Sequence, residues 1–203
     1  DTLFLDEDGI DGLPENYKKE RLKSNGKYAI DMSYPSFSAF MKLAESDEAR
    51  KQLRFKFNNR AVETNIEVLD NIIRERRNLV KLLGYRSYAE YRTEDRMAKN
   101  AKNVWKFEND LKEKLRKKAK RDLIEMMAIK SKRTGKKIVY TVHPWESEYY
   151  ENKVKLEKYN LDSEEVKQYF EFNNVTEGLF TIYQLLFGLI FEKVDNPSVW
   201  HED

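Results

Sequence analysis

Apolar positions along this chain recur mostly every three or four residues, which is the spacing of one face of an α-helix. The clearest stripe covers residues 66–83, and Gly84 follows it as a helix C-cap. A second and highly charged pattern covers residues 99–133 and stops at Gly135. These two patterns predict long helices.

Shorter patterns predict further helices, each placed after a turn or a capping residue. Pro14 suits the start of one helix, because its missing N–H would be unpaired there anyway. Alternation of Tyr28, Ile30 and Met32 with polar neighbours predicts one short strand. The remaining expected helices cover residues 15–22, 33–44, 46–61, 87–97 and 148–159, with another start at 162–163, while 138–140 suit an extended turn or short strand.

The last predicted helix, residues 175–191, is apolar nearly all round and is expected to lie in the core. Its longest apolar stretch, 178–191, is shorter than the roughly 20 residues that span a bilayer. The fold class is therefore all-α, with one short strand or hairpin as the only β-structure. The organisation is one helical segment, 1–203, with sub-units 1–98 and 99–203 as a finer division.

Composition narrows the classes of function. Aromatic residues make up 13% of the 203 residues, which argues against disorder, and the net charge is only +2. The absence of cysteine excludes disulfides, thiolate metal sites and cysteine nucleophiles. It leaves both a cytoplasmic and a periplasmic location open.

No catalytic or metal-ligating set emerges from the residues. The histidines, His143 and His201, are far apart, whereas the zinc-peptidase signature needs two His four apart on a helix with a Glu beside the first. His201-Glu202 matches only the beginning of that signature and follows a turn, so a structural histidine is the favoured interpretation. Adjacent acids such as Glu164-Glu165 do not face each other on a helix.

One basic run, residues 112–137, leaves a choice open. It suits contact with a phosphate backbone, but it also suits a solvated helix face whose lysines lie over an apolar stripe. Acidic residues interrupt the run, and it contains no aromatic side chains on which bases stack. The solvated face is therefore the preferred interpretation, at roughly four to one.

A series of short motifs resembles the thimet oligopeptidase and peptidyl-dipeptidase family of zinc metallopeptidases. Leu82-Leu83-Gly84-Tyr85 and Pro144-Trp145 with Tyr149-Tyr150 carry much of the likeness, with Glu146 where the family usually has Asp. Glu171 stands where the oligopeptidase branch usually has Pro, which leans toward the peptidyl-dipeptidase branch. The matching positions, for which we expect structural roles, are Gly12, Pro14, Pro35, Arg60, Gly84, Tyr85, Trp145, Tyr149, Tyr150, Tyr169, Phe170, Gly178, Trp200, His201 and Asp203.

The resemblance implies a helical, bowl-shaped peptidase with a deep channel for short peptides. It places the zinc motif and the catalytic residues after the segment that ends at Trp200-His201-Glu202-Asp203, so no catalytic, metal or substrate-binding residue is assigned to this chain. Zinc is expected in the parent peptidase and no cofactor in this segment. The segment itself is expected to be inactive and to supply channel wall and support.

The chain starts at Asp1 rather than Met, and it is expected to be a piece of a longer protein. Its expected partners are the remainder of the peptidase and that enzyme's short peptide substrates, with no nucleic acid or membrane. Self-association of the piece through an exposed apolar face is a further expectation. The alternatives are a stand-alone helical protein-interaction module and, more weakly, nucleic-acid binding through residues 112–137.

Overall fold

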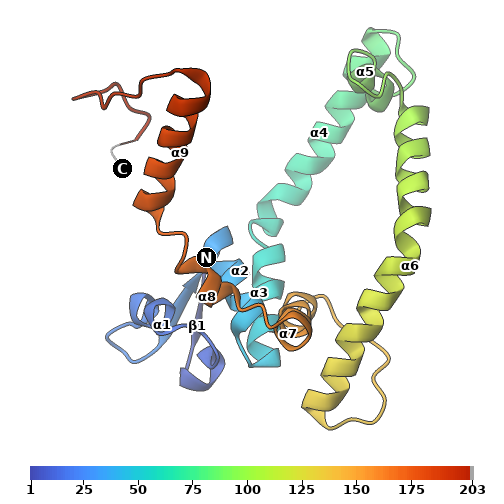
Figure 1. Ribbon diagram of the computed structural model, residues 1–203. Coiled ribbons are helices and arrows are strands. Elements are labelled where there is room, and N and C mark those ends of the chain that lie inside the picture. The colour runs from blue at the N-terminus through green and yellow to red at the C-terminus, as the bar shows by residue number, and fades with distance from the viewer. Residues whose placement is uncertain (202–203) are drawn as a thin grey trace. The chain divides into compact units, whose positions relative to one another are not determined.

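The computed structural model of this protein describes residues 1–201, which are mostly helical (Figure 1). Within this described part, the only sheet has two strands, so the predicted fold class is confirmed. The chain forms two compact units, residues 1–154 and 155–203, and each is considered by itself. The finer division into sub-units 1–98 and 99–203 stays a prediction.

The first unit opens with an antiparallel pair of strands, β1 (Thr2–Leu5) and β2 (Tyr28–Asp31). The strand predicted from alternation is confirmed as β2. Strand β1 escaped prediction because its residues, Thr-Leu-Phe-Leu, do not alternate between apolar and polar. Its partner lies more than twenty residues further along the chain, in register Leu3 with Ile30, so only tertiary pairing reveals it.

Four helical segments pack around this pair, and serine side chains begin two of them. Ser33 accepts a hydrogen bond from the backbone N–H of Ser36, and Ser46 accepts one from that of Ala49. Each bond satisfies a backbone donor that the helix itself leaves unpaired. The four segments are the 3₁₀ helix η1 (Glu7–Ile10), α1 (Glu15–Arg21), α2 (Tyr34–Leu43) and α3 (Asp47–Asn58).

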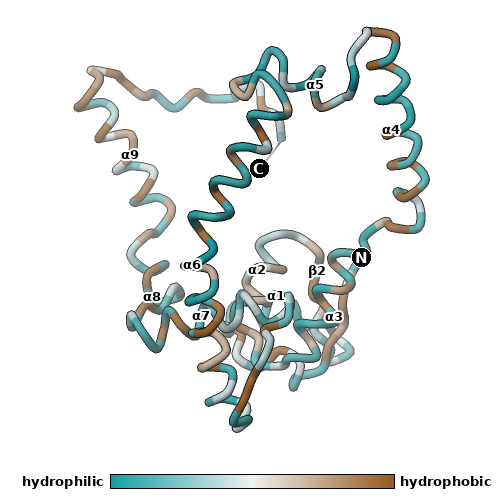
Figure 2. The backbone as a smooth tube through the Cα atoms, turned by 90° about the vertical axis from the view of Figure 1, so that its right-hand side faces the viewer, coloured by the Kyte–Doolittle hydropathy of each residue, from teal (hydrophilic) through white to brown (hydrophobic). Residues whose placement is uncertain are grey.

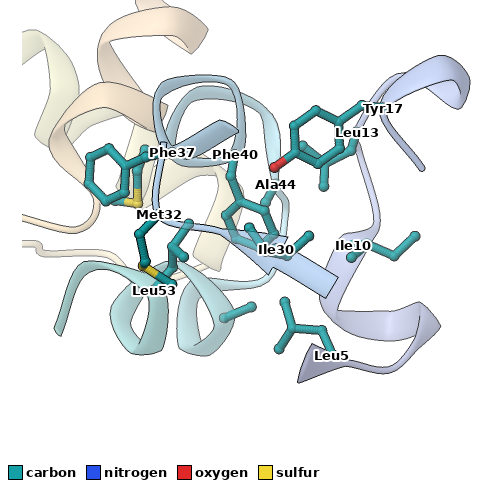
Figure 3. Close-up of a cluster of buried hydrophobic side chains, with 12 residues drawn as sticks. Leu5, Ile10, Leu13, Tyr17, Ile30, Met32, Phe37, Phe40, Ala44 and Leu53 are labelled. Atoms are coloured by element: carbon teal, nitrogen blue, oxygen red, sulfur yellow. The ribbon is translucent and has the colours of Figure 1, made fainter. Parts of the chain in front are cut away.

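The apolar side chains of these elements form one buried cluster (Figure 3). Ile30, Phe40 and Leu53 are completely shielded from solvent and join β2 to α2 and α3. Burying one such side chain stabilises the fold by roughly 1.5–3 kcal/mol. The full cluster is Leu5, Ile10, Leu13, Tyr17, Ile30, Met32, Phe37, Phe40, Met41, Ala44, Ala49 and Leu53.

Two long helices, α4 (Val62–Leu82) and α6 (Ala101–Thr134), lead away from this cluster and back, and both contact the short α5 (Tyr88–Thr93) between them (Figures 1 and 2). Gly84 and Gly135 have φ of 79° and 68° and follow the two long helices, as the sequence predicted. Val80 is the buried residue of α4, so most of its apolar stripe faces solvent.

The first unit closes with α7 (Ser147–Tyr159), which continues into the second unit, where α8 (Ser163–Lys167) and α9 (Phe172–Phe187) follow. The prediction that the last helix lies in the core is wrong for the described residues, because no residue of α9 is buried. Its composition is as apolar as expected, but the unit offers too few other elements to cover it. Residues 138–140 form neither helix nor strand.

In the described part of the chain, no helix is both long and apolar enough to cross a membrane. The longest helix, α6, is dominated by charged residues.

The turn at Gly12 generates a test of how the first unit is packed. Gly12 has φ of 80°, and a Cβ built there would lie 2.6 Å from the backbone oxygen of Leu43 and 2.8 Å from Cγ of Glu45. Gly26 has a similar φ of 76° but no atom within 4 Å of such a Cβ.

We therefore expect Gly12→Ala to lower the free energy of unfolding by at least about 3 kcal/mol, because backbone strain and overlap add. Gly26→Ala carries strain alone and should cost about 1 kcal/mol. Urea unfolding followed by circular dichroism measures both. Equal losses in the two variants would contradict the close packing of Gly12 on residues 43–45.

Candidate functional site

The densest polar arrangement in the first unit surrounds Arg50, one turn into α3, which is 1% exposed. Its guanidinium donates hydrogen bonds to the backbone oxygens of Ala44, Glu45 and Trp145, the last at 3.3 Å. It also pairs with the Asp47 carboxylate at 2.9 Å. A buried guanidinium is tolerated only with such partners, and here they come from both ends of the unit.

Glu45 forms a second centre of the same network, between α2 and α3. Its carboxylate accepts hydrogen bonds from Arg133 of α6 at 2.7 Å, from Lys153 of α7 at 2.8 Å and from the hydroxyl of Tyr149. The partners lie 88 to 108 residues further along the chain. Glu45 therefore fastens the last turn of α6 and the first half of α7 to the N-terminal elements.

A buried ion pair joins α6 to the segment before α7. The Lys130 ammonium lies 2.6 Å from the Glu146 carboxylate and donates a further hydrogen bond to the backbone oxygen of Thr141 at 3.1 Å. The same carboxylate accepts the backbone N–H of His143 at 2.7 Å. Glu146 thus shapes the turn that carries Trp145, and its longer side chain reaches Lys130 where the resembled motif has Asp.

Aromatic rings cover the charged groups. The Tyr149 ring lies 4.1 Å from the guanidinium carbon of Arg50, and it meets the Tyr150 ring edge to face. The Trp145 indole stacks on His143 and donates a hydrogen bond to Asp47 at 3.2 Å. Tyr149 and Tyr150 are 3% and 5% exposed, so the network is largely closed to water.

This environment shifts the titration of two of its members in opposite directions. Burial and the hydrogen bond to Glu45 raise the pKa of Tyr149 far above its ordinary value. Burial by itself would raise the pKa of Glu45, but hydrogen bonds from Lys153 and Tyr149 outweigh it and lower that pKa below 4.5. Both groups consequently hold one protonation state at neutral pH.

The buried polar groups of this arrangement are hydrogen-bonded. Within residues 1–201, every buried side-chain nitrogen or oxygen has at least one hydrogen-bond partner. The contacts of the network join α3 and the preceding Glu45 to α6, to α7 and to the segment before α7. They therefore hold together parts of the first unit that are distant along the chain.

A shallow groove of about 460 Å³ opens beside the network, between the outer face of α3 and Pro144-Trp145. Half-exposed ion pairs stand at its rim, including Arg54 with Glu148 at 4.0 Å. Its lining consists of Glu48, Lys51, Gln52, Arg54, Phe55, Asn58, Asn59, Pro144 and Trp145.

The expected structural positions fall into separate groups. Trp145, Tyr149 and Tyr150 are brought together in the network. Of the others in the first unit, Gly12 and Pro14 stand before α1, Pro35 lies in the first turn of α2, Arg60 donates to the Met32 backbone oxygen, and Gly84 and Tyr85 follow α4. Tyr169, Phe170, Trp200 and His201 belong to the second unit and are exposed, and Gly178 in the same unit is partly buried, while Asp203 lies outside the described residues.

Sequence reasoning missed the charged partners of the network. Glu45, Lys130 and Lys153 look like ordinary surface residues, because their spacing gives no local signal. Glu146 lies in the motif segment of Pro144-Trp145 and stands out there only as the departure from the usual Asp. The motif did not predict that its side chain would be buried in an ion pair with Lys130.

The residues that the structure describes do not fit a zinc ion. Within 1–201, no three His, Cys, Asp or Glu side chains lie together as a metal site would require. His143 stacks on Trp145 instead of standing with a second histidine.

Removing the Arg50 guanidinium tests whether the network fastens the unit. Arg50→Met keeps an apolar chain of similar length but leaves one buried and two partly buried backbone oxygens without this donor. We expect it to lower the free energy of unfolding by about 3 kcal/mol or more. Arg54→Met, one turn further along α3, removes only a surface pair and should cost less than about 0.5 kcal/mol. Similar losses in urea titrations of both variants would refute the role of Arg50.

The lowered pKa of Glu45 predicts a pH-dependent contribution to stability. A carboxyl whose folded pKa lies below its unfolded value near 4.5 stabilises the fold above that value and loses this effect as the pH falls through the folded pKa. At about pH 7, Glu45→Gln should cost about 1–2 kcal/mol, and the difference from the parent chain should shrink below about pH 4. Glu48→Gln, at an exposed surface pair, is the matched control. A difference that grows with acidification would contradict the sign.

Comparison of the amino-acid sequence with known proteins identifies a family and several relatives. Residues 40–203 match the model of peptidase family M3. The chain is 33% identical over 208 residues to saccharolysin of Saccharomyces cerevisiae, covering 96% of this chain and 29% of that protein. It is 31% identical over 202 residues to a probable thimet oligopeptidase of Arabidopsis thaliana, covering 99% and 28%. It is 26% identical over 214 residues to oligopeptidase A of Escherichia coli, covering 99% and 31%.

The matches to these relatives extend over nearly the whole chain, including the N-terminal elements before residue 40. The chain spans about 30% of the length of the curated relatives it matches. The resemblance inferred from its motifs is confirmed, and the chain belongs to peptidase family M3.

Proposed function

We propose that this chain acts as part of a zinc-dependent metallopeptidase that hydrolyses short peptides, and that it supplies wall and support rather than catalytic groups. The match to peptidase family M3 over residues 40–203 is the observation that carries the proposal. Relatives named oligopeptidases support the class of substrate. The peptide products would distinguish the two types, because a peptidyl-dipeptidase releases dipeptides from the C-terminus of its substrate and an oligopeptidase cleaves within it.

The supporting role rests on how the polar network holds the long helices. Glu45 and Lys130–Glu146 anchor the C-terminal end of α6, while α4 continues from α3 after Ala61. The two helices, 21 and 34 residues long, are thereby attached at one end to the packed N-terminal elements and carry apolar side chains on their surfaces. Long helices attached in this way suit the wall of a channel that admits only narrow substrates.

The zinc ion in this proposal is held by residues other than those described here. Zinc would polarise the scissile carbonyl and activate a water molecule in the complete enzyme. No step of that chemistry is assigned to this chain, since its described residues do not form a ligand set.

The proposed partners follow from the same role. They are the remainder of the peptidase, which would cover the apolar face of α9 and the exposed apolar residues in the N-terminal half of α4, and the short peptides that it cleaves. The basic run on α6 is partly neutralised by its own acids, as in the pair of Lys118 with Asp122 at 2.5 Å, which favours a solvated face over nucleic acid. Without the remainder, the exposed apolar residues 179–191 would promote self-association.

Two measurements test this function. The purified 203-residue chain, incubated with zinc and dialysed, should retain substoichiometric metal by plasma emission spectrometry. It should also leave fluorogenic short peptides uncleaved. Stoichiometric zinc together with peptide hydrolysis would overturn the assignment of a supporting role.

The gene provides the second measurement. The reading frame after Asp203 should encode a helix with His-Glu-x-x-His, the pattern that places two zinc ligands and a general base on one face. A stop codon shortly after Asp203 would instead favour a stand-alone interaction module.

A further inference from the structure

Three arginines gather in a pocket that the proposed function does not use. The pocket lies where the C-terminal half of α4 meets the start of α5, and its volume is about 390 Å³. Its lining consists of Ile73, Arg76, Arg77, Val80, Arg86, Ser87 and Tyr88. Three arginines therefore line one pocket, and no carboxylate residue is part of that lining.

The charges of this pocket lack counterions in the described part of the chain. None of Arg76, Arg77 and Arg86 forms an ion pair with a residue of 1–201. The guanidinium of Arg76 lies 4.9 Å from the Tyr88 ring centroid, a contact that leaves its N–H groups available. Elsewhere in the first unit, arginines such as Arg50 and Arg133 are paired with carboxylates.

An anion bound in this lining would be attracted by all three arginines, because none of them has a carboxylate partner in the described part of the chain. Guanidinium groups present forked donors that match the oxygens of phosphate and carboxylate groups. A total charge of three favours a multiply charged oxyanion over chloride. Ser87, whose hydroxyl caps α5 by accepting the backbone N–H of Glu90, and Tyr88 belong to the same lining.

The pocket also has apolar walls. Ile73 and Val80 stand one above the other on α4, and Val80 is only 3% exposed. The volume exceeds that of a bare phosphate ion. Those walls and the Tyr88 ring suit a small apolar body attached to the charged group.

We propose that the pocket between α4 and α5 is an anion-binding site for a phosphate-class oxyanion carried on a small apolar body. This site is separate from the polar network around Arg50, and its existence does not depend on peptidase activity. Arg76, Arg77 and Arg86 bind the oxygens, and Ile73, Val80 and Tyr88 contact the body.

Phenyl phosphate is the direct probe, because it joins a dianionic oxyanion to one ring. Isothermal titration calorimetry of the 203-residue chain at low ionic strength should give a dissociation constant on the order of 1 mM, with weaker binding as salt rises. Phenol tests the ring without the charge and should not bind. Inorganic phosphate tests the apolar body: it should bind more weakly than phenyl phosphate, and equal binding would overturn the part of the proposal that assigns an apolar body to the ligand.

Matched variants locate the site. Arg77→Gln combined with Arg86→Gln should weaken phenyl phosphate binding by at least about tenfold. Arg77→Gln alone should weaken it by at least about threefold. Arg74→Gln makes the same change of charge on α4 as the single Arg77 variant but lies outside the pocket lining, so it should weaken binding by less than about twofold. All these side chains are exposed, and far-ultraviolet circular dichroism should be unchanged. Absence of binding by the parent chain, or an equal loss in the Arg74 variant, would overturn the proposal.

Discussion

The buried guanidinium of Arg50 is the constraint on which the first unit depends. Moving a charge out of water costs several kcal/mol, and the cost is met only where acceptors surround it. Here they are three backbone oxygens and the Asp47 carboxylate. Because one of those oxygens belongs to Trp145, 95 residues away, the N-terminal elements and the start of α7 must come together before the charge is satisfied.

The remaining contacts extend this junction. Glu45 binds Arg133 and Lys153, Glu146 binds Lys130, and Tyr149 and Tyr150 shield the charges. Each partner comes from α6 or α7, so the network closes the long excursion that begins with α4. The polar network holds α6 and α7 to the N-terminal elements, and the apolar cluster holds β1, β2, α2 and α3 to one another. The first unit therefore combines an apolar core with an adjoining network of charged side chains.

This construction suits the supporting role proposed for the segment. The long helices that the polar network holds keep most of their apolar side chains exposed, as on α4, where Ile66 and Leu69 are about half exposed. Surfaces of that size are usually covered in a complete protein. Membership of peptidase family M3, at about 30% of the length of its relatives, accords with a wall element in a larger assembly.

Local signals were enough to predict the helices, because caps and periodicity are properties of neighbouring residues. Ser46 and Gly84 mark helix ends in the sequence and do so in the structure. Strand β1 and the polar network were not predictable in this way, since both need partners that are distant along the chain. The error for α9 has another origin: an apolar helix signals that it requires burial, but not that its covering surface is within the same chain segment.

The most direct test of this account is a double-mutant cycle between Glu45 and Tyr149, which are 104 residues apart in the chain. Glu45→Ala and Tyr149→Phe each remove one side of the hydrogen bond, and the double variant removes both. The account predicts a coupling free energy of about 1–2 kcal/mol in urea unfolding at neutral pH. A coupling near zero would show that the polar network does not hold α7 to the N-terminal elements and would contradict the account.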